Sequence, residues 1–223
     1  VQMGQETLLI DLDPQASLTL SLGIQPHTLK HGVADLLINT NSLISVSRET
    51  AIPGLDLIPS NEQMRLAERF LPIRAEYKLI LRKAIQNIHY DVAILDCPPS
   101  LGAVTQNALV AADLLIIPTA PDYLSSYALR NMMSMIREIR TKINPALKYR
   151  ILITMLDQRV KSHLEFSKKI RATFKHAIFD TNIQIDTRLR DSATAGLPIT
   201  HYLASTRSAK QYRDLAQELH QYV

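Results

Sequence analysis

Three aspartates follow two apolar segments, at the points where each segment ends. Asp11 and Asp13 close the run LLIDLDP, and Asp96 closes the run VAILDCPP. Side chains two residues apart on a strand point to the same side, so Asp11 and Asp13 are expected to face one way. Three carboxylates at one edge of a parallel sheet suit a hard cation such as Mg²⁺, bound directly or through water. The alternative, that each aspartate caps a following helix or turn, stays open.

The segment after Asp96 combines stiff and flexible residues. Cys97 is followed by the tandem prolines Pro98 and Pro99, and Gly102 comes three residues later. Proline fixes the backbone that leaves Asp96, whereas glycine permits a hinge. This composition describes a switch loop that senses phosphate.

Short apolar runs alternate with helix-period segments along the whole chain. Most runs are apolar on consecutive residues, as expected of central parallel strands that are buried on both faces. The expected strands are Thr7–Leu12, Leu55–Pro59, Asp91–Leu95, Leu114–Pro118, Arg150–Met155 and Ala177–Ile183. The expected helices are Asn61–Ile88, broken or kinked at Pro72, then Tyr127–Ile143, Ser162–Phe174 and Ser205–Tyr222. We therefore expect one α/β domain over residues 1–223, a three-layer structure with a mostly parallel twisted sheet and helices on both faces.

The composition excludes several classes of protein. Cys97 is the only cysteine in the sequence, which excludes a disulfide framework and a thiolate metal cluster and favours a reducing, cytoplasmic compartment. No run of about 18 apolar residues is present, so no membrane span is expected.

Positive charge gathers in the last third of the chain. From Arg140 onward there are 15 lysines and arginines against 7 aspartates and glutamates, although the whole chain has a net charge of only +4. Four of these cations are spaced to share one helical face, namely Lys161, Lys168, Arg171 and Lys175. Arg188 and Arg190 are expected on the loop after the next strand. Such side chains grip phosphates without reading sequence, which indicates non-specific binding of double-stranded DNA; a merely solvated basic face is the alternative.

Several segments resemble the signatures of one family. LLIDLDPQASLTLSLG and YDVAILDCPPSLGAVTQNALVAAD are similar to two signature segments of the ParA/Soj partition ATPases, which are deviant members of the P-loop NTPase group. ILITMLDQRVKSHLEFSKKIRATFKHAIFDTNI and DTRLRDSATAGLPITHYLASTRSAKQYRDLAQEL resemble later segments of the same family, in the same order. The resemblance covers almost the whole chain.

The resemblance implies roles for individual residues. Asp13 matches the acid that orients or activates the attacking water, and Asp11 and Asp96 match acids that hold Mg²⁺ through its water shell. Gly102 falls in the second switch loop, which couples the nucleotide to dimerisation. The residues expected to border the adenine of ATP include Thr154, Asp157 and Gln184. Gln184 stands where the family usually has a proline against the base, and Arg188 matches a position associated with DNA binding.

The resemblance also implies partners. Members of this family form ATP-dependent dimers on non-specific DNA and are stimulated by a ParB-like partner during chromosome or plasmid segregation. We therefore expect a cytoplasmic, nucleoid-associated protein with ATP and Mg²⁺ as cofactors, a possible homodimer and no membrane partner. A membrane-positioning relative of the MinD type is disfavoured, because the final helix has mixed charge and neither Trp nor Phe.

One expected motif is missing from the printed sequence. Its six glycines nowhere form G-x-x-x-x-G-K-[ST], the loop whose backbone N–H groups cradle phosphates. Either the natural chain starts one strand–loop–helix unit earlier, or this is a relative without the loop that acts as a non-catalytic DNA- or partner-binding module. In both cases the printed chain is not expected to hydrolyse ATP. Without that strand, the sheet is expected to have unpaired edges.

Overall fold

The chain forms two compact units in the computed structural model, which describes residues 1–38 and 42–222. The first unit comprises Val1–Ala111 and the second Ala112–Val223. The single domain expected over residues 1–223 stays a prediction.

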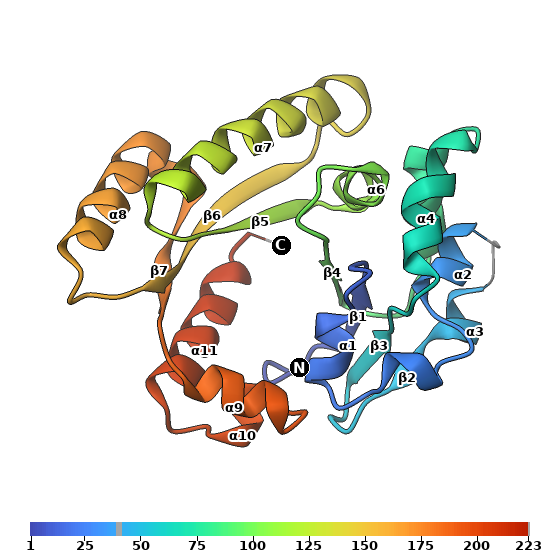
Figure 1. Cartoon of the computed structure of the whole chain (residues 1–223), viewed down its shortest axis with the longest axis horizontal. Helices are drawn as coiled ribbons and strands as arrows, with labels where there is room; N and C mark the ends of the chain where they lie inside the picture. The colour runs from blue at the N-terminus through green and yellow to red at the C-terminus, as the bar shows by residue number, and fades with distance from the viewer. Residues whose placement is uncertain (39–41, 223) are drawn as a thin grey trace. The chain divides into compact units, whose positions relative to one another are not determined.

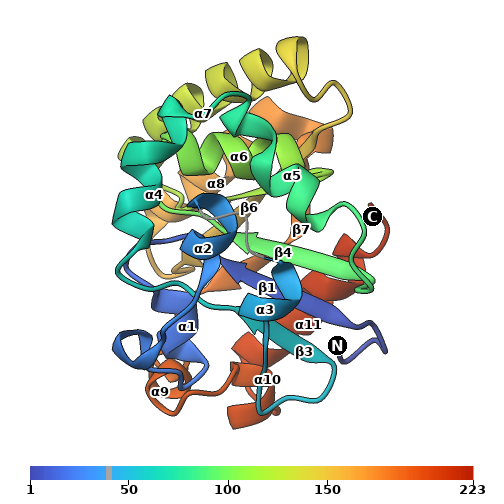
Figure 2. The same cartoon turned by 90° about the vertical axis from the view of Figure 1, so that its right-hand side faces the viewer.

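The first unit is built on a four-stranded sheet in the order β2-β3-β1-β4. Figure 2 shows β3, β1 and β4 side by side. The strands are β1 (Thr7–Asp11), β2 (Arg48–Glu49), β3 (Leu55–Ile58) and β4 (Val92–Asp96). β1 lies in the centre and pairs in parallel with both β3 and β4, whereas β2 is a short antiparallel addition at the edge. Because β1, β3 and β4 are parallel, their carboxyl ends meet at one edge of the sheet.

Short helices connect and follow the strands of this sheet. They are α1 (Ser17–Ser21), α2 (Val33–Ile38), α3 (Leu43–Val46), α4 (Met64–Phe70), α5 (Ile80–Ile85) and α6 (Ala103–Ala111), with 3₁₀ turns η1 (Pro26–Thr28), η2 (Leu71–Ile73) and η3 (Tyr77–Leu79). Leu8, Ile10 and Leu12 point from β1 and its extension into a core formed with α2, α4, α5 and α6. The helical segment expected over residues 61–88 is broken at Pro72, as predicted, because proline has no backbone N–H to donate to a helical hydrogen bond.

The second unit has a three-stranded parallel sheet in the order β5-β6-β7. Its elements are β5 (Leu114–Thr119), α7 (Tyr123–Lys142), β6 (Lys148–Leu156), α8 (Lys161–Phe174), η4 (Lys175–Ala177), β7 (Ile178–Gln184), α9 (Arg188–Thr194), α10 (Ile199–Tyr202) and α11 (Arg207–Leu219). In Figure 1, α7 and α8 lie on one side of this sheet and α11 lies on the other. This unit is therefore a three-layer sandwich.

Alternation along residues 151–153 of β6 supplies both cores of the second unit, before an irregularity that brings Leu156 into the same core as Ile151 and Ile153. Ile151 and Ile153 pack with α7 and α8, whereas Leu152 between them packs with Phe179 and α11 on the opposite face. Two side-chain caps fix where the flanking helices begin. The Asp122 carboxylate accepts a hydrogen bond from Ser125 N at the start of α7, and the Thr206 hydroxyl accepts one from Ala209 N at the start of α11.

The observed architecture confirms the expected α/β class, with one qualification. Hydrogen bonding divides the strands into two sheets instead of one. Within the described residues, β4 ends the first sheet and β5 ends the second, so the unpaired edges expected from the sequence are present. Apolar side chains on β4 are correspondingly open, and Ile94 is 46% exposed.

Candidate functional site

Asp11 is the most deeply placed of the three strand-end carboxylates. It is the last residue of β1 and is fully buried. Oδ2 accepts hydrogen bonds from Thr19 N at 2.9 Å and from Thr19 Oγ1 at 2.7 Å, and Oδ1 accepts one from Asp13 N at 3.1 Å. Burial raises the pKa of Asp11, and these hydrogen bonds counteract part of that rise because they favour the charged form.

A polar network ties this carboxylate to the neighbouring strand end. Thr19 Oγ1 also accepts a hydrogen bond from Ser60 N at 3.0 Å, and Ser60 Oγ donates to the carbonyl oxygen of Asp13 at 2.7 Å. Thr19 and Ser60 are both fully buried. Neither was predicted from the sequence, although Ser60 follows an expected strand by one residue and so lies where site residues gather in parallel sheets.

Asp13 lies two residues beyond β1, half-buried in the connection to α1. Its Oδ1 accepts a hydrogen bond from Gln15 N at 2.8 Å. Asp11 and Asp13 therefore both accept hydrogen bonds from backbone N–H groups of the β1–α1 connection. This is the turn-capping role that was left open as the alternative to cation binding, and the two roles are compatible because each carboxylate has several lone pairs.

Asp96 lies beside Asp11 on the adjacent strand. The two residues are paired in register across β1 and β4. Desolvation raises the pKa of Asp96 to about 6, and the negative charges of Asp11 and Asp13 add to the rise. The structure thus brings the three predicted aspartates together, although residues 1–38 and 42–222 contain no group of three or more His, Cys, Asp and Glu placed to hold a metal ion directly.

Gly102 directly precedes α6, and the carboxylate of a glutamate from another helix lies next to it. Glu68 Oε1 accepts a hydrogen bond from Ala103 N at 3.1 Å, and Glu68 Oε2 accepts one from Val104 N at 3.2 Å. A Cβ at position 102 would lie 1.6 Å from Glu68 Oε1. The glycine leaves room for this carboxylate, and Glu68 of α4 is a capping residue that the sequence did not reveal.

The residues expected around a nucleotide base gather at the carboxyl edge of the second sheet. Thr154 lies near the end of β6, Asp157 follows β6 directly, and Gln184 ends β7, where it pairs in register with Leu156. The Asp157 carboxylate accepts two hydrogen bonds from the Arg159 guanidinium, at 3.0 and 2.7 Å, which lower the pKa of Asp157 to about 2. It therefore carries a fixed negative charge.

Two of the predicted DNA-binding cations make intramolecular bonds. Arg171 donates hydrogen bonds to the carbonyl oxygens of Phe179 and Asp180, and Arg188 Nε lies 3.0 Å from Asp186 Oδ1. Lys161 lies 4.0 Å from Glu165 and remains 92% exposed. Each of these bonds reduces the number of donors left for a phosphate.

The positions of three cations differ from those expected. Lys175 is one residue beyond α8 and has a φ of 39°, so it has left the helical face that it was expected to share. Arg188 and Arg190 lie in α9 and not in a loop. The helix begins here because the Asp186 carboxylate accepts a hydrogen bond from Arg188 N at 3.1 Å.

α8 and α9 lie apart within the second unit in both views (Figures 1 and 2). The structure therefore presents two basic regions. The α8 region comprises Lys161, Lys168, Arg171 and Lys175, and the α9 region comprises Arg188 and Arg190.

The sequence was compared with known proteins. A family model described as an AAA domain matches residues 1–149. The sporulation initiation inhibitor protein Soj of Bacillus subtilis is 32% identical over 220 residues, which cover 97% of this chain and 87% of that protein. The chromosome partitioning protein ParA of Caulobacter vibrioides is 30% identical over 97% of this chain and 83% of that protein. The chain belongs to the ParA/Soj family of partition ATPases.

A solved structure supports the fold expected for such a protein. A protein of Mycobacterium smegmatis described as cobyrinic acid a,c-diamide synthase superposes with a TM-score of 0.84 at 28% identity, over 97% of this chain and 82% of that one. The same protein has been crystallised with an ATP analog and magnesium, and in that form it superposes with a TM-score of 0.72 at 32% identity, over 77% of this chain and 71% of that one. The P-loop NTPase-like fold expected for a ParA/Soj member is thereby confirmed. Among the described residues, no helix is both long and apolar enough to cross a membrane.

Replacement of Thr19 with valine is expected to destabilise this ParA/Soj member. Valine has nearly the same shape but removes the hydroxyl that donates to Asp11 and accepts from Ser60 N. Two buried polar groups then lose a partner, at a cost of about 2 kcal/mol. Urea unfolding should show this loss for T19V and a clearly smaller one for T19S, which keeps the hydroxyl. Equal midpoints for T19V and the parent protein would contradict the network.

Glu68 and Gly102 are expected to show strongly non-additive effects on stability. Glu68→Ala removes the carboxylate that caps α6, at a cost of about 1 kcal/mol. Gly102→Ala should displace the same carboxylate, because the new Cβ meets it at 1.6 Å. A double-mutant cycle by chemical denaturation should therefore give a double variant that is about 1 kcal/mol more stable than the sum of the single losses predicts. Simple additivity would show that the two residues act independently.

Ionisation of Asp96 is expected to lower the free energy of unfolding as pH rises from 4 to 7 in metal-free buffer. Its pKa is raised from 3.8 to about 6 in the folded state, so within this window the folded protein binds the proton more tightly than the unfolded chain does. The free energy of unfolding therefore falls as Asp96 ionises, by on the order of 1 kcal/mol after allowance for solvent screening.

Asp96→Asn should abolish this component and be more stable than the parent protein at pH 7. Denaturation curves at pH 4, 5, 6 and 7 measure the effect. Asn at the exposed Asp113 is the matched control, since Asp113 is not paired with the carboxylates of β1. A D96N variant with the same pH profile as the parent protein would contradict the raised pKa of Asp96.

Proposed function

We propose that this chain is a partition or positioning protein that binds double-stranded DNA without sequence preference, as an ATP- and Mg²⁺-dependent dimer. The observation that carries the proposal is the match to Soj and ParA over 97% of the chain. The excess of cations after Arg140 supports the DNA-binding part, because phosphate contacts by lysine and arginine supply most of the affinity of non-specific binding.

The carboxyl edge of the first sheet suits magnesium held through its water shell. Desolvation raises the pKa of Asp96 and the negative charges of Asp11 and Asp13 add to the rise, and a bound cation counteracts both effects. Asp11 and Asp96 are the residues that would hold the ion, and Asp13 would orient the attacking water. When bound, the ion supplies neutralisation of phosphate charge, which is the main requirement of phosphoryl transfer.

The carboxyl edge of the second sheet is the proposed border of the adenine. Thr154, Asp157 and Gln184 lie there together, at the ends of paired strands. Gln184 N already donates to Gln211 Oε1 at 3.1 Å, so its backbone is anchored from α11. Gly102 belongs to the proposed switch loop, and its contact with Glu68 gives that loop a defined resting position. A ParB-like stimulating protein and association with the nucleoid complete the proposal.

The alternative function is a non-catalytic module that binds DNA or a protein partner without cycling nucleotide. The two functions differ in whether DNA binding responds to Mg-ATP.

Removal of the α8 cations is expected to weaken DNA binding and its dependence on salt. The variant K161Q/K168Q/K175Q should lose about ten-fold in affinity for a fluorescent random-sequence duplex, and the slope of log affinity against log salt should fall by about 2 to 3. Fluorescence anisotropy at several salt concentrations, with and without Mg-ATP, measures both. R188Q/R190Q tests the α9 region separately.

The matched control is R48Q/R65Q/R82Q, which removes three exposed cations from the first unit and lowers the net charge equally. It should retain the parent affinity and salt slope. Equal losses in both triple variants would mean that net charge alone acts, and the proposed DNA surface would be wrong. Binding that is strong but indifferent to Mg-ATP would favour the non-catalytic module.

A further inference from the structure

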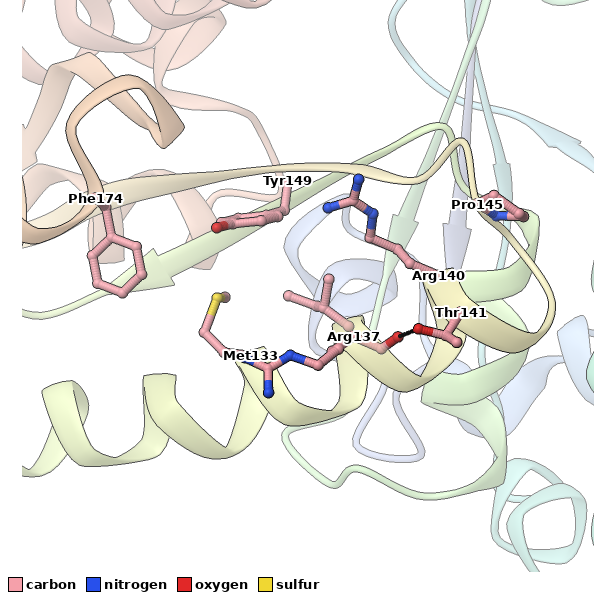
Figure 3. Close-up of a pocket in the computed structure, with 8 residues that line it drawn as sticks. Met133, Arg137, Arg140, Thr141, Pro145, Tyr149 and Phe174 are labelled. Atoms are coloured by element: carbon pink, nitrogen blue, oxygen red, sulfur yellow. Dashed lines mark hydrogen bonds between the residues drawn. The ribbon is translucent and has the colours of Figure 1, made fainter.

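The second unit contains a pocket that none of the functions above uses. It has a volume of about 560 Å³ and lies between α7, the beginning of β6 and the end of α8 (Figure 3). Its walls include Met133, Ile136, Arg137 and Arg140 from α7, together with Tyr149 from β6 and Phe174 from α8. Sites for small molecules in proteins commonly have volumes of about 300 to 1,000 Å³.

The pocket is far from the proposed nucleotide edge of the same unit. Tyr149 is the second residue of β6, whereas Thr154 is five residues further along the strand. At about 3.3 Å per residue, these positions are separated by about 16 Å. The pocket lies at the amino end of the strand, and the residues proposed to border the adenine lie at its carboxyl end. The two are therefore separate sites.

Two arginines give one wall of the pocket an uncompensated positive charge. Arg137 and Arg140 are three residues apart on α7, so they share a face and repel each other. Both are exposed, and no ion pair or hydrogen bond joins either guanidinium to another residue within 1–38 or 42–222. The nearby Glu138 is already paired with Lys142 at 3.0 Å. Figure 3 shows the Arg140 guanidinium extending toward β6 and the Arg137 guanidinium running along α7 toward Met133. Both side chains are exposed and can turn toward an anion in the pocket, and their free donors suit phosphate and carboxylate oxygens.

The remaining walls are apolar and aromatic. Figure 3 shows Met133 pointing from α7 toward Tyr149, with the ring of Phe174 beside them and the Arg140 side chain reaching from α7 toward β6. Ile136 is buried at the base of this arrangement. Methionine adapts its shape to planar groups and contacts them favourably through sulfur. The pocket therefore combines a cationic side with an apolar side.

From this combination we propose that the pocket binds a small organic anion, with a phosphate or carboxylate head on Arg137 and Arg140 and a ring-sized apolar body against Met133, Tyr149 and Phe174. Tight binding requires both the anionic head and the apolar body of the ligand. An inorganic anion leaves the apolar wall uncovered, and a neutral aromatic compound leaves both guanidinium groups unpaired.

The test uses 1-naphthyl phosphate as the probe and the full chain labelled with ¹³C-methyl methionine. The chain has six methionines, so Met133 can be resolved and assigned from an M133L sample, while Met3, Met64 and Met155 report on other regions. The Met133 signal should shift saturably on titration. Binding of 1-naphthol and of inorganic phosphate should each be at least about ten-fold weaker, because each supplies only half of the contacts.

Variants then assign the binding to the two arginines. R137Q/R140Q should weaken the affinity for 1-naphthyl phosphate by about ten-fold. R130Q is the matched control, because Arg130 lies on the same helix over the ring of Tyr127 and does not line the pocket. Both arginines of the pocket are exposed, so the variants are expected to fold, and circular dichroism verifies this.

Three results would overturn the proposal. The first is the absence of a saturable Met133 shift at millimolar probe. The second is binding that R137Q/R140Q leaves unchanged, which would show that the arginines only complement the carboxyl end of α7. The third is binding that is lost in K161Q/K168Q and retained in R137Q/R140Q, which would assign the probe to the α8 region.

Discussion

The buried carboxylate of Asp11 is the constraint on which the first unit depends. Its strand is the centre of the sheet and is hydrogen-bonded on both sides, so the charge at its tip is surrounded by protein. Such a group is tolerated only when donors reach it. Thr19 of α1 provides two of them, and the connection that brings it there passes through Ala16 in a left-handed conformation with a φ of 55°. That conformation costs about 1 kcal/mol for a residue other than glycine. The same network holds the end of β3 through Ser60, and with it the edge where Asp13 and Asp96 lie.

The sequence predicted the strands well because their signal is strong and local. A parallel strand buried on both faces is apolar at consecutive residues, and all six expected strands are present with ends shifted by at most two residues. The helices α1, α2, α6 and α9 and the short elements β2, α3 and α10 were not predicted. The short elements span too few residues to show a period, and α6 is buried on nearly all sides, so it has no amphipathic stripe. The early start of α7 follows from the Asp122 cap and not from the apolar stripe.

In the candidate site, too, some residues could be predicted from the sequence and others could not. The three aspartates could be found from the sequence because each directly follows an apolar run. Their partners could not, since Thr19 reaches Asp11 only through the shape of a turn and Glu68 contacts Ala103 across 35 residues. The roles of the cations were equally hidden. Arg171 and Arg188 look like free positive charges in the sequence, yet their guanidinium groups hold a strand carbonyl and a buried carboxylate. Periodicity places a side chain on a face, but tertiary hydrogen bonds determine what it is free to bind.

The edges of the two sheets have a practical consequence for handling the protein. Within the described residues, β4 and β5 each present one row of backbone N–H and C=O groups without a strand partner. Ile94 adds an exposed apolar side chain to the first of these rows. Natural sheets protect such rows with charge, proline or a covering element, because an open row pairs with any extended chain that reaches it. A net charge of +4 opposes such encounters weakly and is screened by salt. Concentrated solutions at high ionic strength therefore favour edge-to-edge aggregation, and dilute, low-salt storage is the condition under which the chain stays dispersed.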